Sequence, residues 1–415
     1  MTRLALILLA LAAVLLMGPA QAQPLTVYDA LARVEAEHPD LGRLQAALAV
    51  NRGQRLLGFG LDAPTLSYAR EGIDGDGFAE QRFVFGQSLA SPFATYFGLR
   101  RIDAEADALR LDAEARRTLL RQNVEQAFVG VMYAERLIEL RAEAVALADQ
   151  LVEAARLRED VGEAAGLETM RAEIERAGAE AALVEAEQAL ARSRLVVAAA
   201  AALGAEVEVV TPGPLAFRPV DVARADVVGG LPSLPEAQSA RASVAAAGLG
   251  VREAKGARFP GLAVEVFPQD FGDGFNTVGF QVGLRIPIPG TPSVRGPRAV
   301  AEARLREQTW AREATAIQLA AEAEAAWTGY RAALAQVTRY RDVVGPQADT
   351  LVARSYEGYL LGEVPLFALL DAQRTALAAE ERYAAALRDY FLRLAELERF
   401  TGRALVFPGA LAASR

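Results

Sequence analysis

The sequence predicts a mainly α-helical protein with a small β part, in which one structural unit occurs twice. The 415-residue chain is 52% apolar but only 7% aromatic, and it is rich in Ala, Glu, Arg and Leu, a composition typical of long helices. Four short segments alternate apolar residues with small or polar ones, which is the pattern of strands. The same order of helices and strands recurs in the two halves of the chain, as expected for an internal repeat.

Composition also excludes several kinds of site. The net charge of -9 argues against a nucleic-acid partner. The chain has no Cys and a single His, His38, so disulfides, thiolate metal sites and histidine metal clusters are excluded. His38, Pro39 and Asp40 predict a turn before a helix. Phosphate-binding loops and nucleophile elbows are missing from the sequence, so we expect neither an enzyme nor a cofactor.

Residues 1–22 are predicted to be a signal peptide. Arg3 precedes an apolar run, and Ala20-Gln21-Ala22 forms a small-x-small cleavage site. The mature chain would then begin at Gln23; the alternative is a retained membrane anchor. Because no Cys follows the cleavage site, we expect an exported protein that is not lipidated on Cys.

Long helices are predicted in both halves. Residues 99–158 contain no Pro and one Gly, Gly130, and a helix of this length spans about 90 Å. Its apolar residues recur at spacings of three and four, which favours side-by-side packing of helices. Residues 167–203 are predicted to form a second helix that runs back along the first. In the second half, residues 298–357 and 366–401 repeat this pattern, with a kink or local unwinding expected at Gly345-Pro346.

The repeat defines the predicted domain organisation. "HPDLGRLQAALA" at residue 38 resembles "LPEAQSARASVA" at residue 234, and Gly162-Glu163 matches Gly362-Glu363. Gly162 and Gly362 allow the left-handed or strained backbone of a tight reversal. The first repeat is predicted over 23–203, with strands near 63–90 and a hairpin tip near 162. A linker over 204–235, with a short strand at 207–210, joins it to the second repeat. The second repeat is predicted over 236–402, with strands near 260–288 and a tip near 362, and a tail over 403–415 follows.

The strand segments have two different faces. In "TVGFQVGLRIPI", one face carries Val278, Phe280, Val282, Leu284 and Ile286, and the other carries small or polar residues. In "TLSYARE", Leu66, Tyr68 and Arg70 share a face. Such strands suit a β-barrel wall between lipid and water; two hairpins on a soluble core remain the alternative. Four strands cannot close in lipid, because no open edge can face hydrocarbon. A barrel therefore requires several copies, with 8 strands from two chains or 12 from three.

The mature chain resembles the TolC family of outer-membrane efflux proteins. The resemblance rests on the duplicated order of elements and on "GYLLGEVPLFALLDAQRTALAAEERYAAALRDYFLRLAELERFTG", with its Gly-Glu turn, "LLDAQ" and closing "TG". It implies a homotrimer with a 12-stranded outer-membrane β-barrel in contact with lipid and an α-helical barrel tunnel in the periplasm. It also implies a periplasmic adaptor and an inner-membrane RND-type or ABC-type transporter as partners. The short chain and linker look most like the heavy-metal-efflux, CzcC-like branch, whose cargo would be metal cations or small toxic compounds.

The resemblance also implies functional residues. The tips at Gly162, Glu163, Gly362 and Glu363 would dock the adaptor. Glu168 would pair with Tyr359 to hold the periplasmic end of the tunnel closed. Asp371 would contribute to a ring of three carboxylates around the pore, where like charges repel one another or attract a cation. Ala368 replaces a further acid that is frequent in the family, which indicates a weaker ring.

Two other function classes stay open. The same fold also serves type I protein secretion with a different partner. A periplasmic adaptor is also rich in helical hairpins, although it has one central hairpin and a lipoyl-like β domain rather than a twofold repeat. The cargo is not specified by the sequence.

Overall fold

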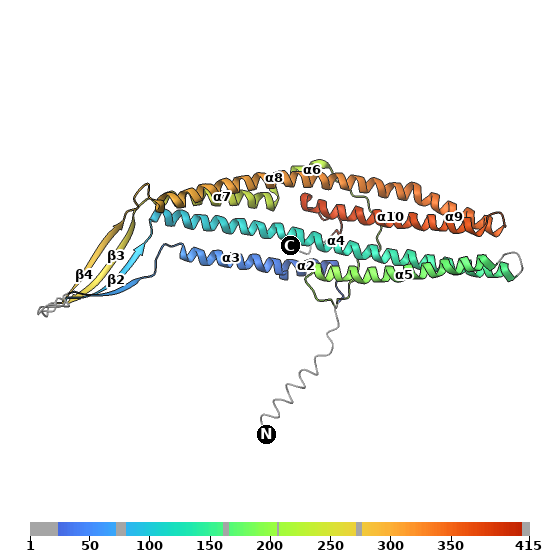
Figure 1. The fold of residues 1–415 in the computed structure, drawn as a ribbon. Helices are drawn as coiled ribbons and strands as arrows, with labels where there is room; N and C mark the ends of the chain where they lie inside the picture. The colour runs from blue at the N-terminus through green and yellow to red at the C-terminus, as the bar shows by residue number, and fades with distance from the viewer. Residues whose placement is uncertain (1–23, 72–79, 161–165, 206, 271–275, 409–415) are drawn as a thin grey trace, which may run out of the picture. The chain divides into compact units, whose positions relative to one another are not determined.

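The computed structural model describes residues 24–71, 80–160, 166–205, 207–270 and 276–408 (Figure 1). The chain forms two compact units, one made of Met1–His38, Thr118–Arg224 and Ala325–Arg415, the other of Pro39–Arg117 and Ala225–Glu324. We call them the hairpin unit and the sheet unit. Each unit takes segments from both predicted repeats. No helix among the described residues is both long enough and apolar enough to cross a membrane.

The sheet unit contains the whole β part of the described chain. Its elements are α3 (Pro39–Leu57), β1 (Thr65–Glu71), β2 (Glu80–Leu89), η1 (Leu231–Ser233), α7 (Pro235–Gly256), β3 (Gly261–Asp270) and β4 (Asn276–Arg285). It also contains the first parts of α4 (Pro92–Asp160) and α8 (Pro292–Arg339). The strands form one antiparallel sheet in the order β1-β2-β3-β4, and Figure 1 shows β2, β3 and β4 side by side. The four predicted strands are therefore confirmed.

The register gives this sheet two distinct faces. Leu66 pairs with Phe85, Phe85 with Val266, and Val266 with Phe280, so one cross-strand row is apolar. The neighbouring row, Thr65, Gly86, Glu265 and Gln281, is small or polar. The apolar face consists of large side chains that are exposed in the single chain: Leu66, Tyr68, Phe83, Phe85, Val266, Val278, Phe280, Val282 and Leu284. We call it the apolar sheet face; it matches the alternation predicted for β1 and β4.

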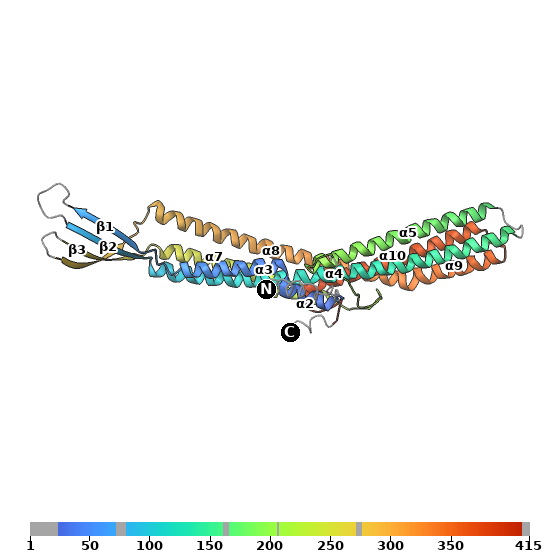
Figure 2. The same ribbon diagram turned by 90° about the horizontal axis from the view of Figure 1, so that it is seen from below.

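The hairpin unit is built from long helices. Its elements are α2 (Val27–Glu37), the second parts of α4 and α8, α5 (Gly166–Ala200), the π-helical turn η2 (Tyr340–Val344), α9 (Gly345–Leu360) and α10 (Leu366–Thr401). The short helix α6 (Arg224–Gly229) begins at its boundary. Figure 2 shows α9 and α10 side by side as a helical hairpin. The predicted ends of α10 agree with the structure, and the predicted local unwinding at Gly345-Pro346 is found as η2, directly before these residues.

A core of large side chains holds the hairpin unit together. Phe128 on α4, Tyr330 on α8, and Tyr390 and Leu394 on α10 are all at most 1% exposed. The interrepeat linker packs on this core, because the Tyr390 hydroxyl accepts a hydrogen bond from the Val220 amide at 3.0 Å and donates one to the Arg218 carbonyl at 2.9 Å. In place of the short strand predicted at 207–210, the linker forms one isolated parallel bridge, Leu25 to Val209.

Candidate functional site

The turn between α9 and α10 is a tight helix reversal with glycine at residues 358 and 362. Gly362 has a φ of +75°, in the left-handed region that glycine adopts without strain. The Gly362 amide donates to the Tyr359 carbonyl at 3.1 Å, and the Glu363 amide donates to the Gly358 carbonyl at 2.9 Å. This is the bonding pattern of a Schellman C-cap. The left-handed turn expected at Gly362 is therefore confirmed.

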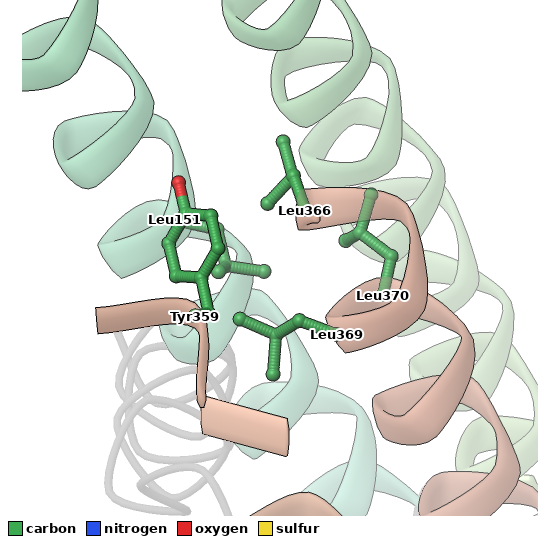
Figure 3. Packing of buried hydrophobic residues seen from close by; sticks show 5 residues of the cluster. All are labelled: Leu151, Tyr359, Leu366, Leu369 and Leu370. Atoms are coloured by element: carbon green, nitrogen blue, oxygen red, sulfur yellow. The ribbon is translucent and has the colours of Figure 1, made fainter. Parts of the chain in front are cut away.

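An apolar cluster lies directly beside this turn. It contains Leu151 from α4, Tyr359 from α9, and Leu366, Leu369 and Leu370 from the first turns of α10. Figure 3 shows the Tyr359 ring among these leucines. Each of the five side chains is at most 7% exposed. The cluster fixes Tyr359 between the two helical hairpins, so the ring cannot leave without opening an apolar core.

Arg158 connects the two predicted gate residues. Its guanidinium carbon lies 5.0 Å from the centroid of the Tyr359 ring, within the range of a cation–π interaction. Its Nη1 atom lies 3.7 Å from Oε2 of Glu168. Within the described residues, no hydrogen bond joins Glu168 directly to Tyr359, and the Tyr359 hydroxyl is buried without a hydrogen-bond partner. The structure thus brings Glu168 and Tyr359 together through a third residue, which we had not singled out from the sequence.

Arg158 carries only a weak sequence signal. It is one of 44 Lys and Arg residues, and it lies in the last turn of α4, where a cation is favoured by the helix dipole. Glu168 lies in the first turn of α5, where an anion is favoured for the same reason. Positions at helix ends therefore explain why the two charges occur there, but not that Arg158 contacts both Glu168 and Tyr359.

Asp371 occupies a different environment from the other two predicted residues. It is exposed on α10, and no hydrogen bond or ion pair links it to Glu168 or Tyr359 in the described part of the chain. Nearby on the same helix, Arg374 forms two hydrogen bonds with Glu175 of α5, one of them 3.1 Å long. This pair joins the two hairpins a short distance along the helices from the tip.

The remaining predicted positions lie partly outside the described structure. Gly162 and Glu163 fall in the segment 161–165, which lies outside the described residues. The predicted signal peptide, residues 1–22, also lies outside them. Glu363 is exposed at the tip of the second hairpin. No group of three or more His, Cys, Asp or Glu residues that could hold a metal ion occurs among the described residues.

Comparisons with known proteins relate part of this chain to a family model. Residues 231–403 match the family model described as outer membrane efflux protein. None of the curated protein sequences matches the chain significantly.

The fold is similar to several solved outer-membrane channels. The outer membrane protein VceC from Vibrio cholerae has 16% identity and a TM-score of 0.75, over 91% of this chain and 96% of VceC. The outer-membrane channel OprN has 17% identity and a TM-score of 0.78, over 91% and 89% of the two chains. The Campylobacter jejuni CmeC outer membrane channel has 14% identity and a TM-score of 0.71, over 91% and 85%. Residues 231–403 are therefore similar to the outer membrane efflux protein family, and the fold of the chain is that of the TolC-like outer-membrane channels.

Proposed function

We propose that this protein is the outer-membrane duct of a tripartite efflux system, working as a homotrimer with a periplasmic adaptor and an inner-membrane transporter. The observation that carries the proposal is the sheet, which has an exposed apolar face and two outer strands, β1 and β4, that each pair with one neighbour only. Unpaired strand edges are not tolerated in lipid. Pairing β4 of one copy with β1 of the next removes every such edge and closes a barrel.

The stoichiometry follows from the strand count. Two copies would give an 8-stranded barrel, whose interior is filled by side chains, whereas three copies give 12 strands and space for a lumen. A duct needs that lumen, which favours the trimer. The small and polar sheet face, including Gly86, Glu265 and Gln281, then lines the lumen, and the apolar sheet face contacts lipid.

The trimer is tested with cysteine cross-links, which the Cys-free chain makes unambiguous. We expect the double variant Ser67→Cys and Gln281→Cys, on β1 and β4, to form covalent trimers with a short bifunctional maleimide in detergent. The matched control places the first cysteine at Val84 on the inner strand β2, which has no free edge, and should give no covalent multimers. Mass determination in detergent gives an independent count of subunits, and a monomer in envelope detergent extracts would contradict the proposal.

We propose that the gate of this duct is formed by Arg158, Glu168 and Tyr359 at the tips of the helical hairpins. Arg158 binds Glu168 on one side and the Tyr359 ring on the other, and thereby ties the first hairpin to the second. The buried Tyr359 hydroxyl has no hydrogen-bond partner among the described residues of the single chain, so the Tyr359 ring is held by Arg158 and the surrounding leucines. Separation of the hairpins then requires breaking these contacts at each tip. Asp371, exposed on α10, is proposed to face the pore and to favour cations.

Single-channel conductance of the reconstituted trimer tests the gate. We expect Glu168→Ala, Tyr359→Ala and Arg158→Lys to raise the conductance, the last because a lysine cannot reproduce the planar stacking of a guanidinium. Glu187→Ala, an exposed position on the same helix as Glu168, serves as the control and should leave it unchanged. If Glu168→Ala, Tyr359→Ala and Arg158→Lys all had the same conductance as the control and the unmodified protein, the tip contacts would not restrict the pore.

Efflux and type I secretion differ in partner and cargo rather than in fold. We propose efflux because residues 231–403 match the outer membrane efflux protein family, and the adaptor is proposed to dock at Gly162, Glu163, Gly362 and Glu363. Growth of a deletion strain on metals, dyes and antibiotics tests this choice. Normal resistance together with loss of a secreted polypeptide would favour secretion.

A further inference from the structure

The C-terminal segment of the described chain is held by two charged side chains from opposite sides. Glu398 Oε1 on α10 accepts hydrogen bonds from the amides of Leu405 at 2.6 Å and Val406 at 2.7 Å. Arg218 Nη2, in the interrepeat linker, donates to the carbonyls of the same two residues. The backbone polar groups of this dipeptide are therefore all bound to ionised groups, and its side chains are at most 5% exposed.

Glu398 has a second acidic neighbour, Glu125 on α4. Glu125 is only 1% exposed, which makes it one of the most buried polar side chains of the described chain. The charge of Glu398 acts on this carboxyl group and raises its pKa, and Oε1 of Glu125 is buried without a hydrogen-bond partner among the described residues. Two carboxylates cannot hydrogen-bond to each other unless one of them carries a proton.

The electrostatic surroundings decide which of the two is protonated. Burial, followed by the charge of Glu398 and the hydrogen bond to it, raises the pKa of Glu125 from 4.5 to about 9, and Arg121 on the same helix opposes this shift. Arg121 is itself bound to Glu35 of α2 at 2.8 Å, so much of its charge is already compensated. Oε1 of Glu398 is already occupied, because it accepts the backbone N–H bonds of Leu405 and Val406.

We propose that Glu125 is a permanently protonated acid at neutral pH that donates its hydrogen bond to Glu398, and that this shared proton locks the C-terminal segment onto α4 and α10. Neutral Glu125 lets Glu398 stay anionic and hold the Leu405 and Val406 amides. When Glu125 loses its proton, two like charges face each other in a buried site. The least costly relief is movement of Glu398, which releases both amides.

The proton linkage has a definite sign. The folded chain retains a proton on Glu125 that the unfolded chain releases above about pH 4.5, so the free energy of unfolding falls as pH rises from there to about 9. Glu125→Gln cannot ionise, yet its amide still donates to Glu398. The variant should therefore gain stability relative to the unmodified protein as pH increases through this range.

Amide hydrogen exchange at Leu405 and Val406 tests the lock in the full-length protein in detergent. At pH 7 we expect equal protection in the unmodified protein and in Glu125→Gln. Above about pH 9 the unmodified protein should exchange at least tenfold faster than the variant at the same pH. Glu398→Gln should weaken protection at every pH, and Glu143→Gln, an exposed position on α4, should behave like the unmodified protein.

Two results of the exchange experiment would overturn the proposal. One is that the amides of Leu405 and Val406 exchange at the same rate in the unmodified protein and in Glu125→Gln at all pH values. The other is loss of protection in Glu125→Gln at pH 7, which would mean that Glu125 acts as an anion. If this variant does not fold, the infrared band of a protonated carboxylic acid in the unmodified protein decides the matter, since it must persist at pH 7 and vanish near pH 9. Absence of the band at pH 7 would refute the lock.

Discussion

Val364 packs directly over Gly358 at the tip of the second hairpin, leaving no space for a side chain at residue 358. A Cβ atom at that position would lie 2.6 Å from Val364 Cγ2 and 3.3 Å from Val364 Cβ. The chain returns over the last turn of α9 at this point, with the Val364 amide donating to the Gly358 carbonyl at 3.1 Å. A specific glycine is thus the condition for so short a reversal.

The first prediction concerns this contact. Gly358→Ala should lower the free energy of unfolding by about 1–3 kcal/mol, because an added methyl group must displace a branched side chain in a packed turn. Thermal unfolding followed by circular dichroism measures the change. Gly178→Ala is the matched control, since nothing lies within 4 Å of its added Cβ, and alanine in an exposed helix should be neutral or stabilising. Equal effects of the two substitutions would show that Val364 yields without cost.

The second prediction concerns the left-handed residue of the same turn. Gly362→Ala should cost about 1–2 kcal/mol, because a Cβ atom disfavours a positive φ. Gly362→Asn should cost less, since asparagine tolerates this conformation. No neighbouring atom lies within 4 Å of the added Cβ, so the difference between the two variants isolates the backbone effect. If urea unfolding gives the same midpoint for both variants, the turn adopts another conformation.

The third prediction concerns the two faces of β4. Phe280→Arg places a charge on the apolar sheet face and should destabilise the membrane-inserted form by about 2–4 kcal/mol. Gln281→Arg, the adjacent residue on the opposite face, should have little effect. The folded fraction in lipid vesicles across a urea series measures both. A stronger effect of Gln281→Arg than of Phe280→Arg would reverse the assignment of the lipid-facing side.

The fourth prediction concerns the anchoring of the interrepeat linker. Tyr390→Phe removes the hydroxyl that binds the Val220 amide and the Arg218 carbonyl. It should cost about 1–3 kcal/mol, because buried polar groups lose their partner. Tyr383→Phe, on the same helix, is the control, since the Tyr383 hydroxyl makes no hydrogen bond within the described residues. Similar melting temperatures for Tyr390→Phe and the unmodified protein would show that the linker is held without the Tyr390 hydroxyl.

The sequence by itself determined the local structure of this protein. Helix and strand periodicity is carried by consecutive residues, which is why the ends of α10, the four strands and their two faces were predicted without a structure. A kink or local unwinding was predicted at Gly345-Pro346, and the structure has it one turn earlier, at Tyr340–Val344. The left-handed turn at Gly362 was predicted for the same reason, since glycine is the residue that adopts this backbone conformation at low cost.

Only the tertiary structure decided which distant residues share an environment. Arg158 lies between Glu168 and Tyr359, and Glu125 lies against Glu398, because long helices pack with particular rotations and particular offsets along their axes. Those rotations depend on the sum of many side-chain contacts and are not encoded in any one segment. For the same physical reason the compact units combine segments of both repeats, although the repeats are what the sequence displays.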